Sequence, residues 1–209
     1  MNYSKIIDIS PVISPQIAVW PGDRPYNHDF SLQIAKGHNI DLSSFTTTVH
    51  VGAHADAPSH YAAKAISIER VRLEPYLGPA QVTEVRLARG ARIRPSDIGD
   101  ELRAPRLLIK TGSFPDPNRF NQDFNSLSAE LIEWLAKQKT VLVGIDTPSI
   151  DPFDDKVLES HQALAKSGLR NLEGLILRDA APGLYSLIAL PLPLQGADAS
   201  PVRAVLLAP

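Results

Sequence analysis

The stretch from Val49 to Tyr61 constrains this chain more than any other, because histidines and a carboxylate crowd into it. It reads V-H-V-G-A-H-A-D-A-P-S-H-Y and holds three of the six histidines. His50, His54, Asp56 and His60 all occupy even positions, with apolar or small residues between most of them. Side chains of an extended chain alternate between two faces. An extended backbone would therefore point all four side chains toward one side.

The residues around this stretch favour a bent strand over a helix. Thr46 to Val49 are β-branched, which suits a strand. A helix would turn Asp56 away from the histidines, and Pro58 would interrupt it. In a regular strand the first two histidines would lie about 13 Å apart at Cα, too far to share an ion comfortably. Gly52 stands between them, so we predict a bend there and an irregular loop beyond it.

The residue types of this stretch are those of a metal site. Imidazole nitrogens and carboxylate oxygens are metal ligands, and no thiolate can contribute because the chain has no cysteine. The alternative is a polar strand with scattered surface histidines. The stretch contains neither Lys nor Arg and its odd positions are mostly apolar, which argues against that alternative. We therefore predict a metal site.

Length and composition exclude several other classes of protein. A chain of 209 residues fits one domain, predicted over 1–209, and 44% hydrophobic with 21% charged residues is ordinary for a globular protein. A net charge of −2 gives no attraction to nucleic acid or anionic membranes. No segment approaches the roughly 20 apolar residues of a bilayer span, and no signal-peptide pattern is present. Without cysteine, a cytoplasmic location is the expectation.

The pattern of apolar residues predicts an α+β protein. Its 18 prolines favour short strands joined by turns. The clearest helix covers Ser128 to Lys139, with Ser128 as its cap, and a second covers Lys156 to Lys166. Shorter helices are predicted within 66–76 and at 95–97. Strands are predicted at 6–9, 16–20, 80–86, 107–110, 140–145, 184–190 and 202–207. We expect a mixed sheet or barrel-like core with few outer helices.

Two further residues could complete the metal site. His161 falls on the apolar face of the second predicted helix, where a lone histidine is more often a core residue than a ligand. Glu173 stands between a leucine and a glycine, just before the apolar run 175–177. Burying this carboxylate without a partner would be costly. A cation would offset that cost and would suit His161 equally well.

Other polar residues carry weaker signals. His28 and His38 lie in a polar segment without partners at ligand spacing, so we leave both out of the site. Asp146 and Ser149 follow the predicted strand 140–145, a position where functional groups often gather. A simple turn role for these two residues is equally open. Trp20 precedes a P-G-D turn, and the sequence alone favours a place for it in the core.

The central stretch resembles the H-x-G-T-H-x-D-x-P-x-H signature of the cyclase-like metal-dependent hydrolases, a family that includes the bacterial kynurenine formamidases. The resemblance extends to W-P-G-D at 20–23 and to D-T-P-S-x-D at 146–151, followed by a histidine and then a glutamate. It covers essentially the whole chain. One position departs, because Ala53 stands where the signature has threonine. A hydroxyl that could hydrogen-bond a neighbouring group is therefore missing.

This resemblance implies a fold, an assembly and a set of ligands. The fold is a swivelling β/β/α architecture, and the assembly is a homodimer or larger. The implied ligands hold two divalent ions, because five protein ligands are too many for one catalytic zinc. Zinc is the first choice, and manganese also fits nitrogen and oxygen ligands. The implied ligands are His50 and His54 for one ion, His161 for the other, and Asp56 and Glu173 for both.

The resemblance also implies a reaction. In it, a metal-activated hydroxide hydrolyses N-formyl-L-kynurenine to L-kynurenine and formate, a step of tryptophan breakdown. His60 would be the general acid and base, since an imidazole with a pKa of about 6.5 suits proton transfer. The alternative is a structural role, in which His60 forms a hydrogen bond with Asp56. The resemblance also makes Trp20 a substrate contact.

Two competing functions stay open. One is hydrolysis of a cyclic amide such as isatin by a member of the same family. The other is a metal- or ligand-binding protein without turnover. His60 argues against the second, because a pure binding site needs no additional proton carrier.

Overall fold

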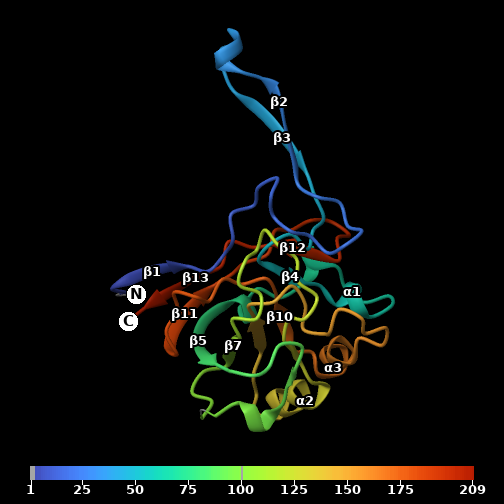
Figure 1. Ribbon diagram of the computed structural model, residues 1–209, viewed down its shortest axis with the longest axis vertical. Helices are drawn as coiled ribbons and strands as arrows, with labels where there is room; N and C mark the ends of the chain where they lie inside the picture. The colour runs from blue at the N-terminus through green and yellow to red at the C-terminus, as the bar shows by residue number, and fades with distance from the viewer. Residues whose placement is uncertain (1–2, 100) are drawn as a thin grey trace.

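A seven-stranded mixed sheet forms the centre of the protein (Figure 1). The computed structural model describes residues 3–99 and 101–209. In spatial order the strands are β1 (Lys5–Asp8), β13 (Val205–Ala208), β11 (Gly183–Ile188), β5 (Leu77–Glu84), β7 (Arg106–Lys110), β9 (Leu142–Ile145) and β10 (Arg170–Leu172). Strands β5, β7, β9 and β10 run parallel, while the other three pair antiparallel. The first and last strands of the chain are therefore neighbours.

Two helices cover one face of this sheet. They are α2 (Ala129–Lys137) and α3 (Glu159–Ser167). Helix α2 begins where the sequence predicted, because the Ser128 hydroxyl accepts a hydrogen bond from the Leu131 amide at 3.1 Å. Its apolar face is fully buried, which stabilises the fold by about 1.5–3 kcal/mol per large side chain. The residues in this cluster include Leu131, Ile132, Leu135, Ala163, Leu164, Leu107, Ile109, Val143 and Ile145.

The opposite face of the sheet carries the segment with the clustered histidines. Leu108 points to this face, whereas its neighbours Leu107 and Ile109 point to the helices, as alternation along a strand requires. The alanines between the histidines pack here against the sheet. The members of this second cluster include Ala53, Ala55, Ala57, Val82, Leu108, Leu142 and Leu172. Small side chains let the segment lie close to the strands beneath it.

Short elements complete the body of the protein. Strand β4 (His54–Asp56) pairs antiparallel with β12 (Ala199–Pro201), and β6 (Arg92–Ile93) pairs with β8 (Ser126–Leu127). Helix α1 (Pro58–Tyr61) has proline in its first turn, where proline is tolerated. Single 3-10 turns occupy Ile34–Lys36, Ile68–Arg70, Glu74–Tyr76 and Pro95–Asp97. None of the helices in the described part of the chain has the length and apolar character that a bilayer crossing requires.

One hairpin projects away from the body. It consists of β2 (Asn27–Leu32) and β3 (Leu42–Thr46), and Figure 1 shows it as an extended arm. Nearly every residue of both strands is exposed, including Phe30 at 47% and Phe45 at 64%. We call this hairpin, residues 27–46, the arm.

Several expectations from the sequence are confirmed and others are wrong. The α+β class, the mixed sheet and the helix over 128–139 are confirmed. The strand at 16–20 is wrong, since that segment has no regular structure. The predicted helix within 66–76 is two 3-10 turns. The predicted helix over 156–166 begins only at Glu159, because Leu158 adopts a left-handed conformation with φ of 56°.

Candidate metal centre and active site

The first half of the site is built by a bend rather than by a long strand. Strand β3 ends at Thr46, so the strand expected to continue through the β-branched residues up to Val49 is not formed. The predicted bend at Gly52 is confirmed by its φ of +62°. The bend brings the rings of His50 and His54 to 5.0 Å between centroids. Asp56 lies between them, with its Oδ1 at 3.2 Å from His50 Nδ1 and 3.6 Å from His54 Nε2.

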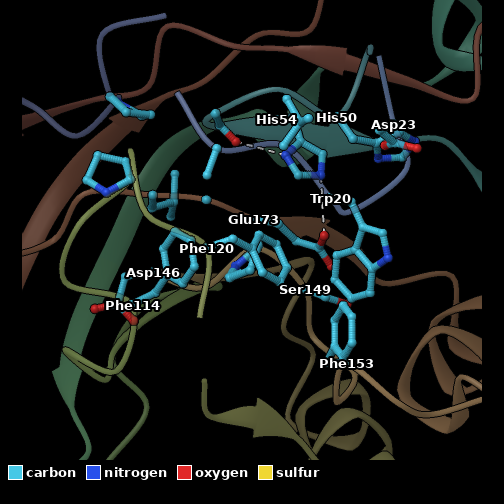
Figure 2. A pocket seen from close by; sticks show the side chains of 18 of the residues that line it. Trp20, Asp23, His50, His54, Phe114, Phe120, Asp146, Ser149, Phe153 and Glu173 are labelled. Carbon is cyan, nitrogen blue, oxygen red and sulfur yellow. Dashed lines mark hydrogen bonds and ion pairs between the residues drawn. The ribbon is translucent and has the colours of Figure 1, made fainter. Parts of the chain in front are cut away.

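The second half of the site comes from the far end of the chain. Glu173 follows strand β10, and its backbone forms two hydrogen bonds with the backbone of His54 at 3.0 and 3.1 Å. His161, on α3, places Nε2 at 3.4 Å from both Asp56 Oδ2 and Glu173 Oε1. Figure 2 shows Glu173 facing His54, whose Nε2 is 3.3 Å from Glu173 Oε2. The structure thus brings all five predicted ligand residues together.

Hydrogen bonds fix which nitrogen each buried ring presents to this cluster. His161 Nδ1 lies 2.7 Å from Asp151 Oδ2, and the Asp151 carboxylate also accepts from the amides of Ser160 and His161. His54 Nδ1 lies 2.9 Å from the Gly52 carbonyl oxygen. Both rings are therefore held with Nε2 toward the carboxylates. Metal-ligating histidines are oriented in this way by a partner on the other ring nitrogen.

Two buried atoms at the centre of the cluster lack a hydrogen-bond partner. They are His54 Nε2 and Asp56 Oδ1, which face each other at 3.6 Å. Each atom has one closer neighbour at ion-pair distance, Glu173 Oε2 at 3.3 Å for His54 Nε2 and His50 Nδ1 at 3.2 Å for Asp56 Oδ1. An unsatisfied buried polar group costs about 1–3 kcal/mol. A divalent cation between these atoms would offset that cost. Candidate donor atoms of His50, His54 and Asp56 lie within 4.8 Å of one another, so this nitrogen and oxygen donor set fits a divalent metal ion.

Asn171 holds the two carboxylates side by side. Its Nδ2 donates to Asp56 Oδ2 at 2.6 Å and to Glu173 Oε1 at 3.2 Å. The Ile150 amide also donates to Glu173 Oε1, at 2.9 Å. These donors stabilise two buried negative charges that would otherwise repel each other.

Without a metal, the cluster is a network of ion pairs. Burial alone would raise the pKa of Asp56, but its close contacts with His161 and His50 hold it well below its usual value. Burial and the Asp56 charge oppose ionisation of Glu173, yet His161 and His54 lower its pKa. Burial would lower the pKa of His50, but Asp198 and Asp56 raise it to about 10. The pKa of His161 is raised well above its usual value by Asp151, Asp56 and Glu173, against the effect of burial.

The cluster forms part of the wall of a cavity of about 360 Å³. His50, His54, His161 and Glu173 all line it, together with an aromatic wall. Figure 2 shows Trp20 beside Phe153 and near Phe120. The ring centroids of Trp20 lie 5.1 Å from Phe153 and 5.5 Å from Phe120. Trp20 is thus a cavity wall rather than a fully buried core residue, and the volume suits a small aromatic molecule.

His60 also lines the cavity. Its Nδ1 lies 3.0 Å from Asp198 Oδ2. Asp198, rather than Asp56, is therefore the hydrogen-bond partner of this ring. His28 and His38 lie on the exposed arm, outside the site, as predicted.

Asp146 and Ser149 have structural contacts within the D-T-P-S segment. The Asp146 carboxylate accepts hydrogen bonds from the amides of Thr111 and Gly112 and from the Thr111 hydroxyl. Burial raises the pKa of Asp146, although these hydrogen bonds oppose the shift. The Ser149 hydroxyl accepts from the Asp151 amide. Both residues reach the cavity, and their contacts support a role in shaping its loops.

Sequence reasoning missed Asp151, Asn171 and Asp198. Asp151 is the last residue of D-T-P-S-x-D, so the motif contained its signal. Asn171 precedes Glu173 by two positions, and this spacing puts both side chains on one side of an extended chain. Asp198 lies far along the chain from the histidines, and no local pattern pointed to it.

Comparison with known proteins identifies the family. The model of the family described as "Putative cyclase" matches residues 7–152, more than half of the chain. This chain belongs to the putative cyclase family. Among curated members, a protein named kynurenine formamidase from Bordetella petrii is 43% identical over 205 residues, covering 97% of both chains. The protein of the same name from Bordetella pertussis is also 43% identical, over 204 residues and 97% of both chains.

Solved structures of similar proteins share the putative cyclase fold. One, described as a potential metal-dependent hydrolase with cyclase activity, has a TM-score of 0.83 at 26% identity and covers 97% of this chain and 96% of its own. A predicted metal-dependent hydrolase from Bacillus stearothermophilus has a TM-score of 0.82 at 26% identity, covering 97% of both chains. Isatin hydrolase A from Labrenzia aggregata, at 19% identity and a TM-score of 0.83 over 98% and 93%, is similar in fold alone. The cyclase-like fold implied by the sequence is thus confirmed.

Proposed function

We propose that this protein hydrolyses N-formyl-L-kynurenine to L-kynurenine and formate. The observation that carries the proposal is the cluster of imidazoles and carboxylates in the wall of an aromatic cavity. It occurs in a chain 43% identical, over 97% of its length, to proteins named kynurenine formamidase. A formamide presents an unhindered carbonyl, and its aryl ring matches the aromatic wall.

The proposed cofactor is a pair of divalent metal ions, zinc first and manganese as the alternative. We propose that His50, His54, Asp56, His161 and Glu173 would hold them. When bound, such a pair would lower the pKa of a coordinated water to about 7 and polarise the substrate carbonyl. The orphaned His54 Nε2 and Asp56 Oδ1 support this ligand set, because a cation would pair both buried atoms.

Other side chains would bind the substrate and move its proton. Trp20 and Phe153 are positioned to stack on the aryl ring. His60 is proposed to transfer a proton to the leaving nitrogen through Nε2, because Nδ1 already faces Asp198. All three of these residues line the same cavity as the metal cluster.

Two charged residues in the cavity lining favour an amino-acid substrate over isatin. Lys156 and Asp23 both line it. In the described part of the chain, Lys156 has no ion-pair partner. N-formylkynurenine carries a carboxylate and an ammonium group, which these side chains can pair with, whereas isatin has neither.

A direct assay tests the proposal. The purified protein is analysed for metal content and assayed with N-formyl-L-kynurenine and with isatin. We expect turnover of the formamide, bound divalent metal, loss of activity on exhaustive chelation, and recovery with zinc or manganese. Turnover of isatin alone would establish the cyclic-amide alternative. Metal binding without turnover of either substrate would establish a binding protein.

We also propose a homodimer in which a second copy covers the arm. The arm exposes Phe30, Ile40, Leu42 and Phe45, although an isolated two-stranded hairpin is marginally stable in water. One domain over 1–209 is proposed because strands from both ends of the chain share the central sheet. The cytoplasmic location stays a prediction.

A further inference from the structure

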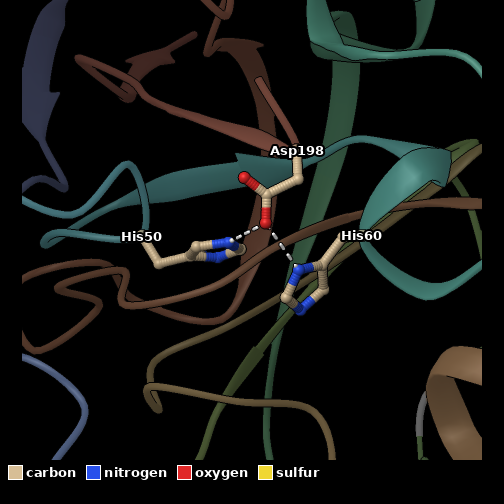
Figure 3. A group of neighbouring side chains, drawn as sticks. All are labelled: His50, His60 and Asp198. Atoms are coloured by element: carbon tan, nitrogen blue, oxygen red, sulfur yellow. Dashed lines mark hydrogen bonds and ion pairs between the residues drawn. The ribbon is translucent and has the colours of Figure 1, made fainter. Parts of the chain in front are cut away.

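One carboxylate oxygen contacts two of the site histidines. Asp198 Oδ2 lies 3.1 Å from His50 Nε2 and 3.0 Å from His60 Nδ1, and Figure 3 shows the two rings converging on it. The two rings are 4.4 Å apart between centroids. Asp198 belongs to none of the motifs that pointed to the metal site, and it lies 138 residues beyond His60 in the chain.

The backbone fixes Asp198 next to the elements that carry the other site residues. Its carbonyl accepts a hydrogen bond from the Ala57 amide at 2.8 Å, directly before the helix α1 that bears His60. The following residue, Ala199, pairs with Asp56 across strands β12 and β4. The preceding residue, Ala197, accepts from the Ile68 amide at 2.9 Å. The backbone of Asp198 is therefore held on both sides by segments that carry site residues.

The chemistry of the contact assigns the proton on His60. A carboxylate oxygen accepts hydrogen bonds, and Asp198 Oδ2 lies 3.0 Å from His60 Nδ1. The His60 nitrogen that faces Asp198 must then carry a proton. The remaining nitrogen, Nε2, has no hydrogen-bond partner within 3–99 and 101–209, and its ring lines the cavity. His60 Nε2 is thus free to take up or release a proton there.

We propose that Asp198 is the positioning residue of His60. It holds the ring with Nδ1 protonated and Nε2 turned toward the substrate, as a carboxylate does for a general-base histidine in hydrolytic triads. This inference rests on the proposed function, because it assigns His60 its orientation for the same reaction. The contact with His50 is a second role of the same oxygen, and the test must separate the two roles.

The kinetics of a double-mutant cycle distinguish the role of Asp198 toward His60 from its role toward His50. Asp198→Ala should lower kcat by about 10- to 100-fold, the usual cost of losing a partner that orients an active-site ligand or base, with KM and bound metal little changed. In a His60→Ala background, Asp198→Ala should cost nothing further, because residues that act as a unit are not additive. Asp198→Asn keeps an oxygen acceptor without the charge and should recover part of the activity.

Asp179→Ala serves as the control for the removed charge. Asp179 is exposed, does not line the cavity, and has no hydrogen-bond or ion-pair partner in the described structure. This variant should retain wild-type kcat. An equal loss in both variants would mean that net charge, not position, matters, and would overturn the proposal.

A measurement on the metal-free protein is independent of turnover. Nitrogen-15 spectra of the His60 ring, taken at a pH where it is neutral, should show the Nδ1–H tautomer in the wild type and a shift toward Nε2–H in Asp198→Ala. This result would support the positioning role even if N-formylkynurenine proved not to be the substrate. An unchanged tautomer would overturn the role. The role would also be overturned if Asp198→Ala lowered kcat by the same factor in the His60→Ala background as in the wild type. A loss of bound metal that parallels the loss of activity would overturn it as well.

Discussion

The backbone of Gly174 packs directly against the backbone of Gly52, and the two halves of the site meet at this crossing. A Cβ atom on Gly174 would lie 2.1 Å from the Gly52 carbonyl oxygen, far inside van der Waals contact. Gly174 also has a φ of +65°, a left-handed conformation that glycine adopts without strain. The crossing lets Glu173 pair with His54 along the backbone. The absence of a side chain at Gly174 is therefore a condition for assembling the cluster.

Substituting Gly174 by alanine should destabilise the protein and disrupt its metal site. Left-handed strain costs about 1–3 kcal/mol, and the overlap with the Gly52 carbonyl adds a comparable amount, so we expect a loss of about 3 kcal/mol or more. Urea unfolding and metal analysis of the variant would measure both effects. Gly90→Ala is the matched control, because Gly90 has a φ of +76° but no atom within 4 Å of the place where a Cβ would lie. Equal destabilisation of the two variants would contradict the role of the crossing.

Metal affinity should rise with pH. In the metal-free protein the pKa of His50 is raised to about 10 and that of His161 is raised well above its usual value, so both rings hold protons at neutral pH. A metal ion binds the neutral imidazole and must displace these protons. The apparent association constant should increase by about tenfold per pH unit for each displaced proton, from about pH 6.5 toward pH 10. Competition with a chelator of known affinity at several pH values would measure it, and a flat profile would contradict the prediction.

His60→Ala and Asp56→Ala should have different effects. The first variant should keep its metal, but its rate of hydrolysis should fall by about 10²- to 10⁴-fold, the usual contribution of general acid–base catalysis. The second should lose both metal and activity, because Asp56 lies between His50, His54 and His161. Metal analysis beside initial rates distinguishes the two outcomes. Retained turnover in the His60 variant would remove it from the mechanism.

The sequence predicted those parts of the fold whose signals are local. The Ser128 cap and the spacing of Leu131, Ile132 and Leu135 define helix α2 without reference to the rest of the chain. The bend at Gly52 follows equally from one residue. The segment 16–20 was expected to be a strand, yet no strand of the described chain pairs with it. The segment lines the cavity instead. Whether a segment pairs as a strand depends on a second segment, so its own residues do not decide it.

The residues of the cluster were predictable in type, whereas the residues that contact the cluster were only partly so. His50, His54 and Asp56 were indicated by composition and spacing, and resemblance to a family added His161 and Glu173. The position of Asp198 in the site depends on the pairing of strand β12 with β4, a contact between segments more than 140 residues apart. Only the folded chain brings this carboxylate to the histidines.

Lys156→Ala should weaken binding of the amino-acid substrate specifically. If Lys156 pairs with the substrate carboxylate, its loss should raise KM for N-formyl-L-kynurenine about tenfold, or 1.4 kcal/mol, with little change in kcat. A simple aryl formamide such as formanilide lacks the carboxylate and should be hydrolysed as before. Lys166→Ala removes an exposed lysine of α3 that does not line the cavity and should leave both substrates unaffected. A parallel rise in KM for both substrates would contradict a pairing with the carboxylate.

Phe45→Asp should convert a dimer into monomers. Phe45 is 64% exposed on the arm, where it stacks at 5.8 Å on Tyr26 rather than entering the core of its own chain. A second copy covering this face would bury the ring, so a carboxylate there would be desolvated without a partner. Sedimentation velocity should show a dimer for the wild type and a monomer for the variant, with circular dichroism unchanged. Leu73→Asp is the control, because Leu73 is 50% exposed and is not part of the arm. A monomeric wild type at tens of micromolar would contradict the proposed dimer, and equal dissociation of both variants would contradict the assignment of the arm as its interface.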